Sequence, residues 1–230
     1  MIDLAVFDMA GTTVTDKDFV AKAFQKAFWN QKVKISEAEV NPFMGYPKPI
    51  AIQMVLENAG VESDEELVQK IHEDFVSGMI DFYEDSPYVQ PMPDAEDLFF
   101  YLQEKGVCIV LNTGFSRDIA EVIVNRFQWT DRGLVDDFIG SDEVEQGRPF
   151  ADMIKTLKGR NGFSEDAIVM KVGDTVVDIL EGKAAGCKYV IAVTTGAASK
   201  EELAAYNPTH IIAALSEIPA ILRQEKQQYV

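Results

Sequence analysis

Short apolar runs mark the start of the chain and recur through its second half. The first run is Ile2 to Phe7. The later candidate strands, which follow Gly106, are residues 107–111, 136–140, 168–172, 189–193 and 210–213. Runs of this length are typical of buried strands, and their alternation with amphipathic segments favours a parallel sheet with helices on both faces. We therefore predict an α/β fold.

The segment from residue 17 to residue 86 has a different pattern, with apolar residues at helical spacing and no strand-like run. Its first helix is expected to present one apolar face, formed by Phe19, Ala23, Phe24, Ala27 and Phe28. Prolines at positions 87, 91 and 93 then precede the strand-rich half. We predict two units, in which residues 1–16 and 87–230 form a sheet core and residues 17–86 form an all-helical insertion.

Two further helices are expected within this insertion. Ile50, Met54 and Val55 have helical spacing, and Pro49 suits a first helical turn because the missing amide hydrogen would have no helical partner there. The next helix is expected to begin at Ser63, which starts a capping-box pattern that ends in Glu66.

Composition limits the partners of this fold. The chain has 230 residues, of which 47% are hydrophobic, and a net charge of -17 that opposes binding to nucleic acid or to an anionic membrane. Cys108 and Cys187 lie in apolar stretches and are interpreted as core residues rather than a disulfide. With no run of membrane-spanning length and no secretory-type start, we predict a cytoplasmic protein. The sequence leaves a homodimer open.

Carboxylates follow two of the predicted strands. Asp8 comes directly after the first run, and Asp174 and Asp178 come after the run that ends at residue 172. Because the carboxyl ends of parallel strands meet at one edge of a sheet, we expect these groups to converge. A few carboxylates around one point suit Mg²⁺, which prefers oxygen ligands.

Two other strand ends carry groups that suit a phosphoryl ligand. Thr113 and Gly114 follow one strand and would offer a hydroxyl and backbone amides to phosphoryl oxygens. Arg148 would supply the positive charge that an acidic chain needs in order to bind a small anionic metabolite.

These residues carry a resemblance to a known superfamily. The chain resembles the haloacid dehalogenase (HAD) superfamily at its four sequence motifs. In chain order, the residues that match these motifs are Asp8, Thr113, Arg148, and Asp174 with Asp178. The resemblance spans nearly the whole chain and implies a Rossmann-like core with a helical cap inserted after the first motif. It also implies that Asp8 attacks phosphorus and that water hydrolyses the resulting aspartyl-phosphate. Asp8, Asp174 and the backbone carbonyl of Ala10 would then ligate Mg²⁺, with Asp178 supporting them.

Ala10 narrows the resemblance to the phosphonoacetaldehyde hydrolase (phosphonatase) family. Phosphate-transferring enzymes of this design usually carry a second acid at this position, whereas phosphonatases carry alanine followed by Gly-Thr-Thr, as in Gly11-Thr12-Thr13. A second similarity lies in Met44-Gly45-Tyr46-Pro47-Lys48, which resembles the cap segment that holds the family's Schiff-base lysine. The residues Ala10, Gly11, Thr12, Met44, Gly45 and Gly114 are accordingly predicted to contact substrate.

Alanine at position 10 and lysine at position 48 suit the same kind of leaving group. A phosphomonoester leaves as an alkoxide and benefits from an acid, whereas a carbon leaving group needs an electron sink, which an iminium on a lysine provides. Lys48 precedes Pro49, and the positive end of a helix beginning there would disfavour the ammonium form. We therefore predict an imine between Lys48 and a carbonyl substrate.

Three positions depart from the phosphonatase pattern. The family's proton-transfer histidine corresponds to Ala51, its tyrosine after the second motif to Phe115, and a cysteine to the region of Asp18. Neither His72 nor His210 lies near enough in sequence to be an obvious replacement for that histidine. The substrate is therefore less well defined than the reaction at phosphorus.

Two other classes of function remain open at this level. The first is a phosphomonoester phosphatase of the phosphoglycolate-phosphatase-like kind; a phosphomutase is less favoured because it uses the acid that Ala10 replaces. The second is a non-catalytic phosphometabolite sensor, which Asp8 and Asp174 argue against, since binding an anion gains nothing from an added carboxylate.

Overall fold

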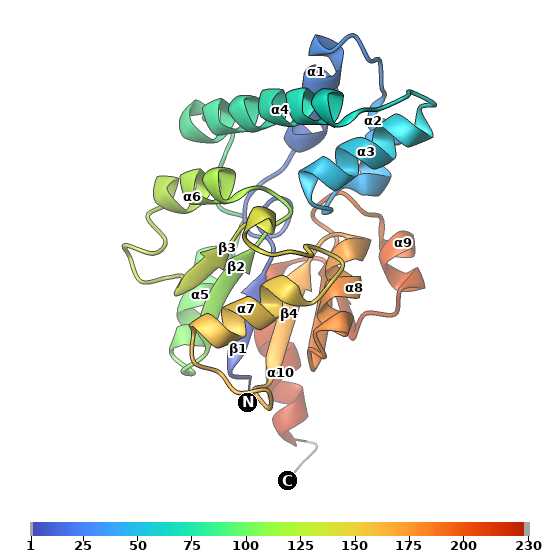
Figure 1. Cartoon of the computed structure of the whole chain (residues 1–230). Coiled ribbons are helices and arrows are strands. Elements are labelled where there is room, and N and C mark those ends of the chain that lie inside the picture. The colour runs from blue at the N-terminus through green and yellow to red at the C-terminus, as the bar shows by residue number, and fades with distance from the viewer. Residues whose placement is uncertain (1, 228–230) are drawn as a thin grey trace.

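Six parallel strands form the centre of the molecule, in the order β3-β2-β1-β4-β5-β6 (Figure 1). The computed structural model describes residues 2–227. The strands are β1 (Leu4–Phe7), β2 (Cys108–Asn112), β3 (Asp137–Ile139), β4 (Val169–Gly173), β5 (Tyr189–Val193) and β6 (His210–Ile212). Each predicted strand is present within one or two residues of its expected bounds, and the predicted α/β fold is confirmed.

β1 lies in the middle of the sheet and is buried on both faces, as its uninterrupted apolar sequence predicts. Ala5 and Phe7 join an apolar cluster with α5 (Ala95–Gln103), α6 (Arg117–Arg126) and α10 (Ile218–Gln227). Leu4 and Val6 point to the opposite face and pack on α7 (Asp152–Arg160). On that face, α8 (Val176–Ala184) packs on β4 and β5, and α9 (Lys200–Ala205) lies beside it.

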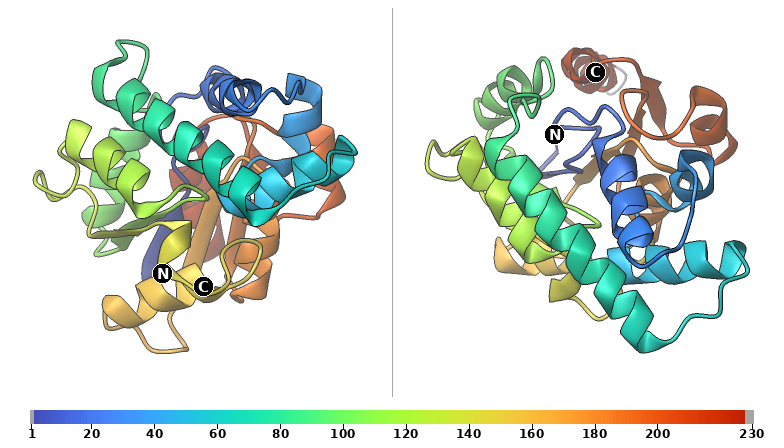
Figure 2. Two further views of the ribbon diagram at one scale, coloured as in Figure 1. Left: turned by 45° about the horizontal axis from the view of Figure 1, so that its top comes forward. Right: turned by 90° about the horizontal axis from the view of Figure 1, so that it is seen from above.

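A group of helices covers the carboxyl ends of the strands (Figures 1 and 2). Between β1 and α5 the chain forms α1 (Phe19–Asn30), α2 (Glu37–Val40), the short 3₁₀ helix η1 (Asn41–Phe43), α3 (Lys48–Asn58) and α4 (Glu65–Asp85). Seen from above, α4 crosses the molecule beside α1 and α3. The expected helical cap is therefore present. Its limits at residues 17 and 86 remain a prediction from the sequence.

Two details of the cap helices differ from the sequence prediction. Ile50 was assigned to the apolar face of α3, but it is 44% exposed, and the buried face runs through Ala51, Ile52, Val55 and Leu56. The pattern was misread because both faces of this helix carry apolar residues. Ser63 does not cap α4; Asp64 does, by accepting a hydrogen bond from the amide of Leu67 at 2.8 Å.

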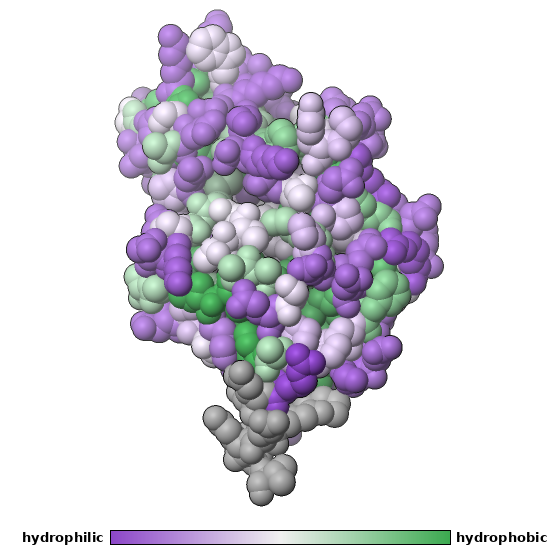
Figure 3. All heavy atoms as spheres, turned by 180° about the vertical axis from the view of Figure 1, so that it is seen from behind, coloured by the Kyte–Doolittle hydropathy of each residue, from purple (hydrophilic) through white to green (hydrophobic). Residues whose placement is uncertain are grey.

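The surface agrees with the acidic composition. Polar side chains cover most of the cap on the face shown in Figure 3, with apolar patches lower on the molecule. Within residues 2–227, no helix has both the length and the apolar character needed to cross a membrane.

Candidate active site

The turn after β1 fixes the position of Asp8. The carbonyl of Met9 accepts hydrogen bonds from three successive amides, those of Thr12, Thr13 and Val14. Gly11 has a φ of +84°, and a Cβ there would lie 2.8 Å from Oδ2 of Asp174. Glycine is therefore required at this point both for the backbone conformation and for the close approach of Asp174.

Three carboxylates converge at the carboxyl end of the sheet, as predicted. Oxygens of Asp8, Asp174 and Asp178 lie within 4.8 Å of one another, and all three side chains are buried. Asp174 is oriented through both oxygens, because the hydroxyl of Thr12 donates to Oδ1 at 2.9 Å and the amide of Ala197 donates to Oδ2 at 2.8 Å. Thr12 thus serves the carboxylate cluster.

Arg148 is buried and joins this cluster through every side of its guanidinium. Nη1 contacts Oδ1 of Asp8 at 2.7 Å and Oδ1 of Asp178 at 3.0 Å. Nε contacts Glu181 at 3.1 Å, and Nη2 donates to the carbonyl and the side-chain oxygen of Asn112, both at 2.8 Å. These five acceptors match the five N–H groups of an arginine, so its orientation relative to Asp8 is fixed.

A second buried cation, Lys171 on β4, lies behind Arg148. Its Nζ contacts Asn112 at 2.6 Å, Asp178 at 2.9 Å and Glu181 at 3.1 Å. The other oxygen of Glu181 accepts from the side-chain amide of Asn112 at 2.7 Å. The sequence prediction missed this network, although a lysine inside an apolar strand and a glutamate one helical turn after Asp178 were visible signals.

The charges of the cluster do not balance. Its carboxylates are those of Asp8, Asp174, Asp178 and Glu181, and its cations are Arg148 and Lys171. If every group is ionised, two negative charges remain, and Asp174 has no cation within ion-pair distance among the described residues. A divalent cation with a preference for oxygen ligands would neutralise this excess.

The pKa values of the carboxyl groups follow from the same imbalance. Burial, reinforced by the charges of Asp8 and Asp178, raises the pKa of Asp174 well above its ordinary value. Burial also raises the pKa of Asp8, against the attraction of Arg148. For Asp178 burial acts in the same direction, but Arg148 and Lys171 outweigh it and lower the pKa. Asp8 and Asp174 therefore carry the uncompensated charge, as expected of ligands for a metal ion.

Lys48 is the first residue of α3, after Pro47 and before Pro49, and its side chain is only 3% exposed. Its Nζ donates to the carbonyl of Tyr46 at 3.3 Å and lies 5.2 Å from the ring centre of Phe115. Burial lowers the pKa of Lys48 to about 8, although the charge of Asp8 opposes this shift. A neutral amine is therefore accessible near neutral pH.

One small cavity, of about 40 Å³, brings most of the predicted site residues together. Its lining includes the predicted residues Asp8, Ala10, Met44, Gly45, Lys48, Thr113, Gly114, Arg148 and Asp174. Three predicted residues lie outside this lining, namely Gly11 and Thr12 in the turn and Asp178 behind Arg148. Residues that were not predicted also line it, among them Asp16, Val20, Thr175 and Ala197.

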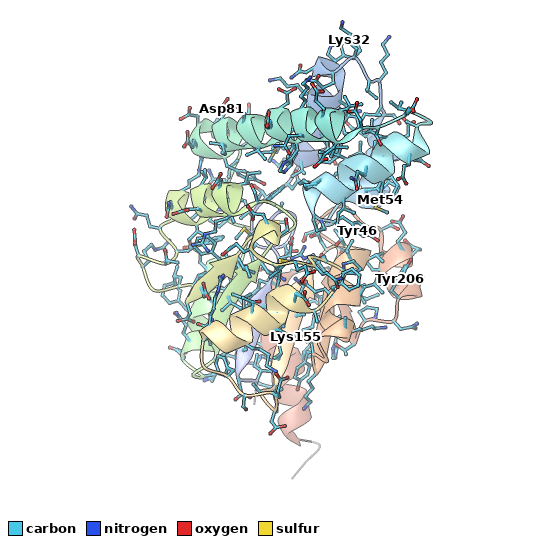
Figure 4. All side chains as sticks on the ribbon, in the orientation of Figure 1. Lys32, Tyr46, Met54, Asp81, Lys155 and Tyr206 are labelled. Carbon is cyan, nitrogen blue, oxygen red and sulfur yellow. The ribbon has the colours of Figure 1, made fainter. Side chains whose placement is uncertain are left out.

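The cap loop meets the core tightly at this cavity. Gly45 has a φ of +87°, and a Cβ there would lie 2.5 Å from Oγ1 of Thr175, the residue that caps α8. Thr175 also lines a larger groove of about 550 Å³, whose wall includes Tyr46 below α3 and Tyr206 at the end of α9 (Figure 4). The cavity and the groove share Met44, Thr175 and Ala197.

The sequence model of the haloacid dehalogenase-like hydrolase family matches residues 5–192 of this chain. The parallel sheet, the helices over its carboxyl end and the aspartate after the first strand agree with this match. The chain belongs to the haloacid dehalogenase-like hydrolase family, and it is a hydrolase of the HAD type.

The chain is similar to several individual proteins. It is 27% identical over 197 residues to the phosphonoacetaldehyde hydrolase of Bacillus cereus strain B4264. The aligned region covers 80% of this chain and 73% of that protein. The structure of a phosphonoacetaldehyde hydrolase-like protein from Oleispira antarctica superimposes with a TM-score of 0.84 at 20% identity, over 97% of this chain and 92% of that one. A predicted phosphoglycolate phosphatase from Haemophilus somnus superimposes with a TM-score of 0.79 at 20% identity, over 96% and 98%.

Proposed function

We propose that this hydrolase cleaves the carbon–phosphorus bond of a small phosphonate that carries a carbonyl group, of which phosphonoacetaldehyde is the simplest case. The carrying observation is that Lys48 and Asp8 line one buried cavity, while the position usually held by a leaving-group acid is Ala10. The similarity to phosphonoacetaldehyde hydrolases supports the same substrate class.

Lys48 acts first on the organic part of the substrate. Its neutral amine attacks the carbonyl carbon, the carbonyl oxygen leaves as water, and an iminium forms. The aromatic rings of Phe24 and Phe115, whose centres lie 5.9 Å and 5.2 Å from Nζ, exclude water from the amine and stabilise the cation that develops there.

Asp8 then accepts the phosphoryl group. One of its oxygens bonds to phosphorus, the carbon–phosphorus bond breaks, and the electron pair passes to carbon to form an enamine. Protonation of that carbon and hydrolysis of the imine release the aldehyde and regenerate Lys48. A second water hydrolyses the aspartyl-phosphate to phosphate. Arg148 holds Asp8 in place through Nη1 at 2.7 Å, and Thr113 faces the transferred group from the cavity wall.

Mg²⁺ suits the uncompensated charge of the cluster. Asp8, Asp174 and the backbone carbonyl of Ala10 would hold it, and Asp178 would support them through Arg148 and Lys171. When bound, the ion would neutralise negative charge on the oxygens of the phosphoryl group as Asp8 attacks.

Stability should report this metal independently of activity. A carboxyl with a raised pKa in the folded state contributes stability at low pH, and that contribution is lost as pH rises through the raised value. Without metal, the protein should therefore lose stability as Asp174 ionises. Because Mg²⁺ binds the ionised form, the rise in Tm that it produces should grow as the pH rises through the raised pKa of Asp174.

Calorimetry with Mg²⁺ and with EDTA measures the difference in Tm between the two conditions at each pH. In Asp174→Asn this Tm difference should no longer vary with pH. In Asp166→Asn, a change at an exposed residue outside the site, the pH dependence of the Tm difference should be that of the wild type. A Tm difference that does not vary with pH in the wild type, or one that persists in Asp174→Asn, would contradict the assignment.

The proposed reaction is tested by incubating the wild-type protein and Mg²⁺ with phosphonoacetaldehyde, phosphoglycolate and p-nitrophenyl phosphate, and measuring phosphate release. We expect turnover of phosphonoacetaldehyde, with acetaldehyde formed in equal amount. Borohydride added during turnover should reduce the imine and leave a stable adduct on Lys48, located by peptide mass spectrometry. Turnover without that adduct, or no turnover of the phosphonate, would refute the proposal.

A second candidate is a phosphoglycolate-type phosphatase. With a pKa of about 8, Lys48 is mostly protonated at neutral pH, and its ammonium group would pair with a carboxylate on the substrate. The same assay separates the two functions, because a phosphatase of this kind would release phosphate from phosphoglycolate and leave phosphonoacetaldehyde intact.

A further inference from the structure

Imine chemistry at Lys48 needs a group that moves protons. The carbonyl oxygen must leave as water, and the enamine carbon must be protonated after the carbon–phosphorus bond breaks. In the phosphonatase family, which this chain resembles, a histidine assists proton transfer. The corresponding residue here is Ala51, which is buried in α3. His72 lies instead at a separate cavity of about 170 Å³ beside Pro47 and Pro49, and His210 lies on β6. Neither histidine lines the cavity that contains Lys48.

Asp16 does line that cavity, together with Lys48 and Asp8. It lies between β1 and α1, and its Oδ1 accepts hydrogen bonds from the amides of Phe19 at 2.8 Å and Val20 at 3.3 Å. These two bonds fix the carboxyl group at the start of α1 and involve one of its oxygens. The other oxygen, Oδ2, is left for a ligand in the cavity.

The remaining carboxyl groups in the cavity lining have other partners. Asp8 contacts Arg148, and Asp174 is held by Thr12 and by the amide of Ala197. Both are the metal ligands of the proposed reaction. Among the residues that line the cavity, Asp16 is therefore the carboxyl group that remains for proton transfer.

We propose that Asp16 is the acid–base residue that exchanges protons with the substrate bound to Lys48. The inference rests on the proposed carbon–phosphorus cleavage. The protonated carboxyl of Asp16 gives its proton to the carbinolamine oxygen, which leaves as water while the C=N bond forms. After the carbon–phosphorus bond breaks, Asp16, protonated again from water, gives a proton to the enamine carbon, and the resulting iminium is hydrolysed to the aldehyde.

The electrostatic surroundings of Asp16 agree with this role. Burial raises the pKa of Asp16, and the nearby charge of Asp18 acts in the same direction. The amides of Val20 and Phe19 and the charge of Lys48 oppose the shift without cancelling it. A larger fraction of Asp16 is therefore protonated near neutral pH than of an exposed aspartate.

The test compares Asp16→Asn with Asp18→Asn. Asparagine at position 16 keeps an oxygen for the amides of Phe19 and Val20, so the start of α1 is preserved while proton transfer is lost. The control position, Asp18, is exposed and has a φ of 61°, a conformation that asparagine tolerates. Each variant is assayed with phosphonoacetaldehyde and with p-nitrophenyl phosphate, whose leaving group needs neither an imine nor an acid.

For Asp16→Asn we expect kcat on phosphonoacetaldehyde to fall by about 100-fold or more, and hydrolysis of p-nitrophenyl phosphate to change by less than about threefold. Borohydride trapping on Lys48 should slow in parallel. Asp18→Asn removes only a minor contribution to the raised pKa of Asp16, so its kcat on phosphonoacetaldehyde should stay within about threefold of the wild-type value.

Three results would overturn the inference. Equal loss of both activities would assign Asp16 to the fold alone, and unchanged cleavage of the phosphonate would remove it from the reaction. Each of these leaves the proposed function standing. A wild-type protein that neither cleaves phosphonoacetaldehyde nor forms the adduct would overturn both.

Discussion

Replacing Asp8 by asparagine is expected to lower kcat by at least about 10⁴-fold for every substrate, because each proposed reaction passes through a covalent bond to this carboxylate. Asparagine has nearly the same shape and can still accept a hydrogen bond from Nη1 of Arg148, so the site should keep its geometry. Phosphate release measured under Mg²⁺ saturation gives the rate, and beryllofluoride binding reports the acceptor oxygen directly.

The folded state provides the control for this variant. Since burial raises the pKa of Asp8, its ionised form destabilises the metal-free protein, and the neutral amide should leave Tm in EDTA equal or higher. Beryllofluoride should label the wild type and Asp166→Asn but not Asp8→Asn. Turnover by a folded Asp8→Asn protein within about tenfold of the wild-type rate would exclude Asp8 as the phosphoryl acceptor.

Replacing Lys48 is expected to separate two activities that share one site. Lys48→Met removes the amine but fills the space between Phe24 and Phe115, and Lys48→Arg keeps a positive charge that does not form an imine. Both variants should lose cleavage of phosphonoacetaldehyde by at least about 10³-fold, because the carbon leaving group no longer has an electron sink. Hydrolysis of p-nitrophenyl phosphate should stay within about threefold of the wild-type rate.

The comparison between methionine and arginine makes this test selective. If Lys48 only attracts the phosphoryl group, Lys48→Arg should retain both activities and Lys48→Met should lose both. Lys26→Met, a change at an exposed position on α1, controls for the loss of one positive charge from the cap. Phosphonate cleavage that survives in Lys48→Arg would rule out the imine.

The strand pattern was the most informative part of the sequence for the fold. A fully buried parallel strand needs apolar residues on both faces, so central strands such as Leu4–Phe7 and Tyr189–Val193 produced continuous apolar runs. The cap helices were harder to orient, because they are covered partly by each other and partly by the core. In α3 this arrangement buries Ala51 and exposes Ile50, although Ile50 was among the residues from which the apolar spacing of this helix was read.

The candidate site was predicted where a side chain directly follows a strand. Asp8, Thr113 and Asp174 were found in this way, because strand ends of a parallel sheet share one edge. Lys171 and Glu181 were missed because the local signals, a lysine inside a strand and a glutamate one helical turn after Asp178, do not reveal partners that are distant in sequence. Asp16 was missed for a related reason, since only the folded chain brings Asp16 and Lys48 to one cavity.

The central position of β1 affects the order in which the sheet can form while the protein is being synthesised. Leu4 pairs with Cys108 on one side and with Val169 on the other, so β1 is synthesised before both of the strands that flank it. Pairings this distant form slowly, whereas the contacts among α1, α3 and α4 are closer in sequence and can form earlier. During synthesis, contacts among the cap helices can therefore form before β1 is paired, and the carboxylate cluster is complete only after Asp174 and Asp178 have been synthesised.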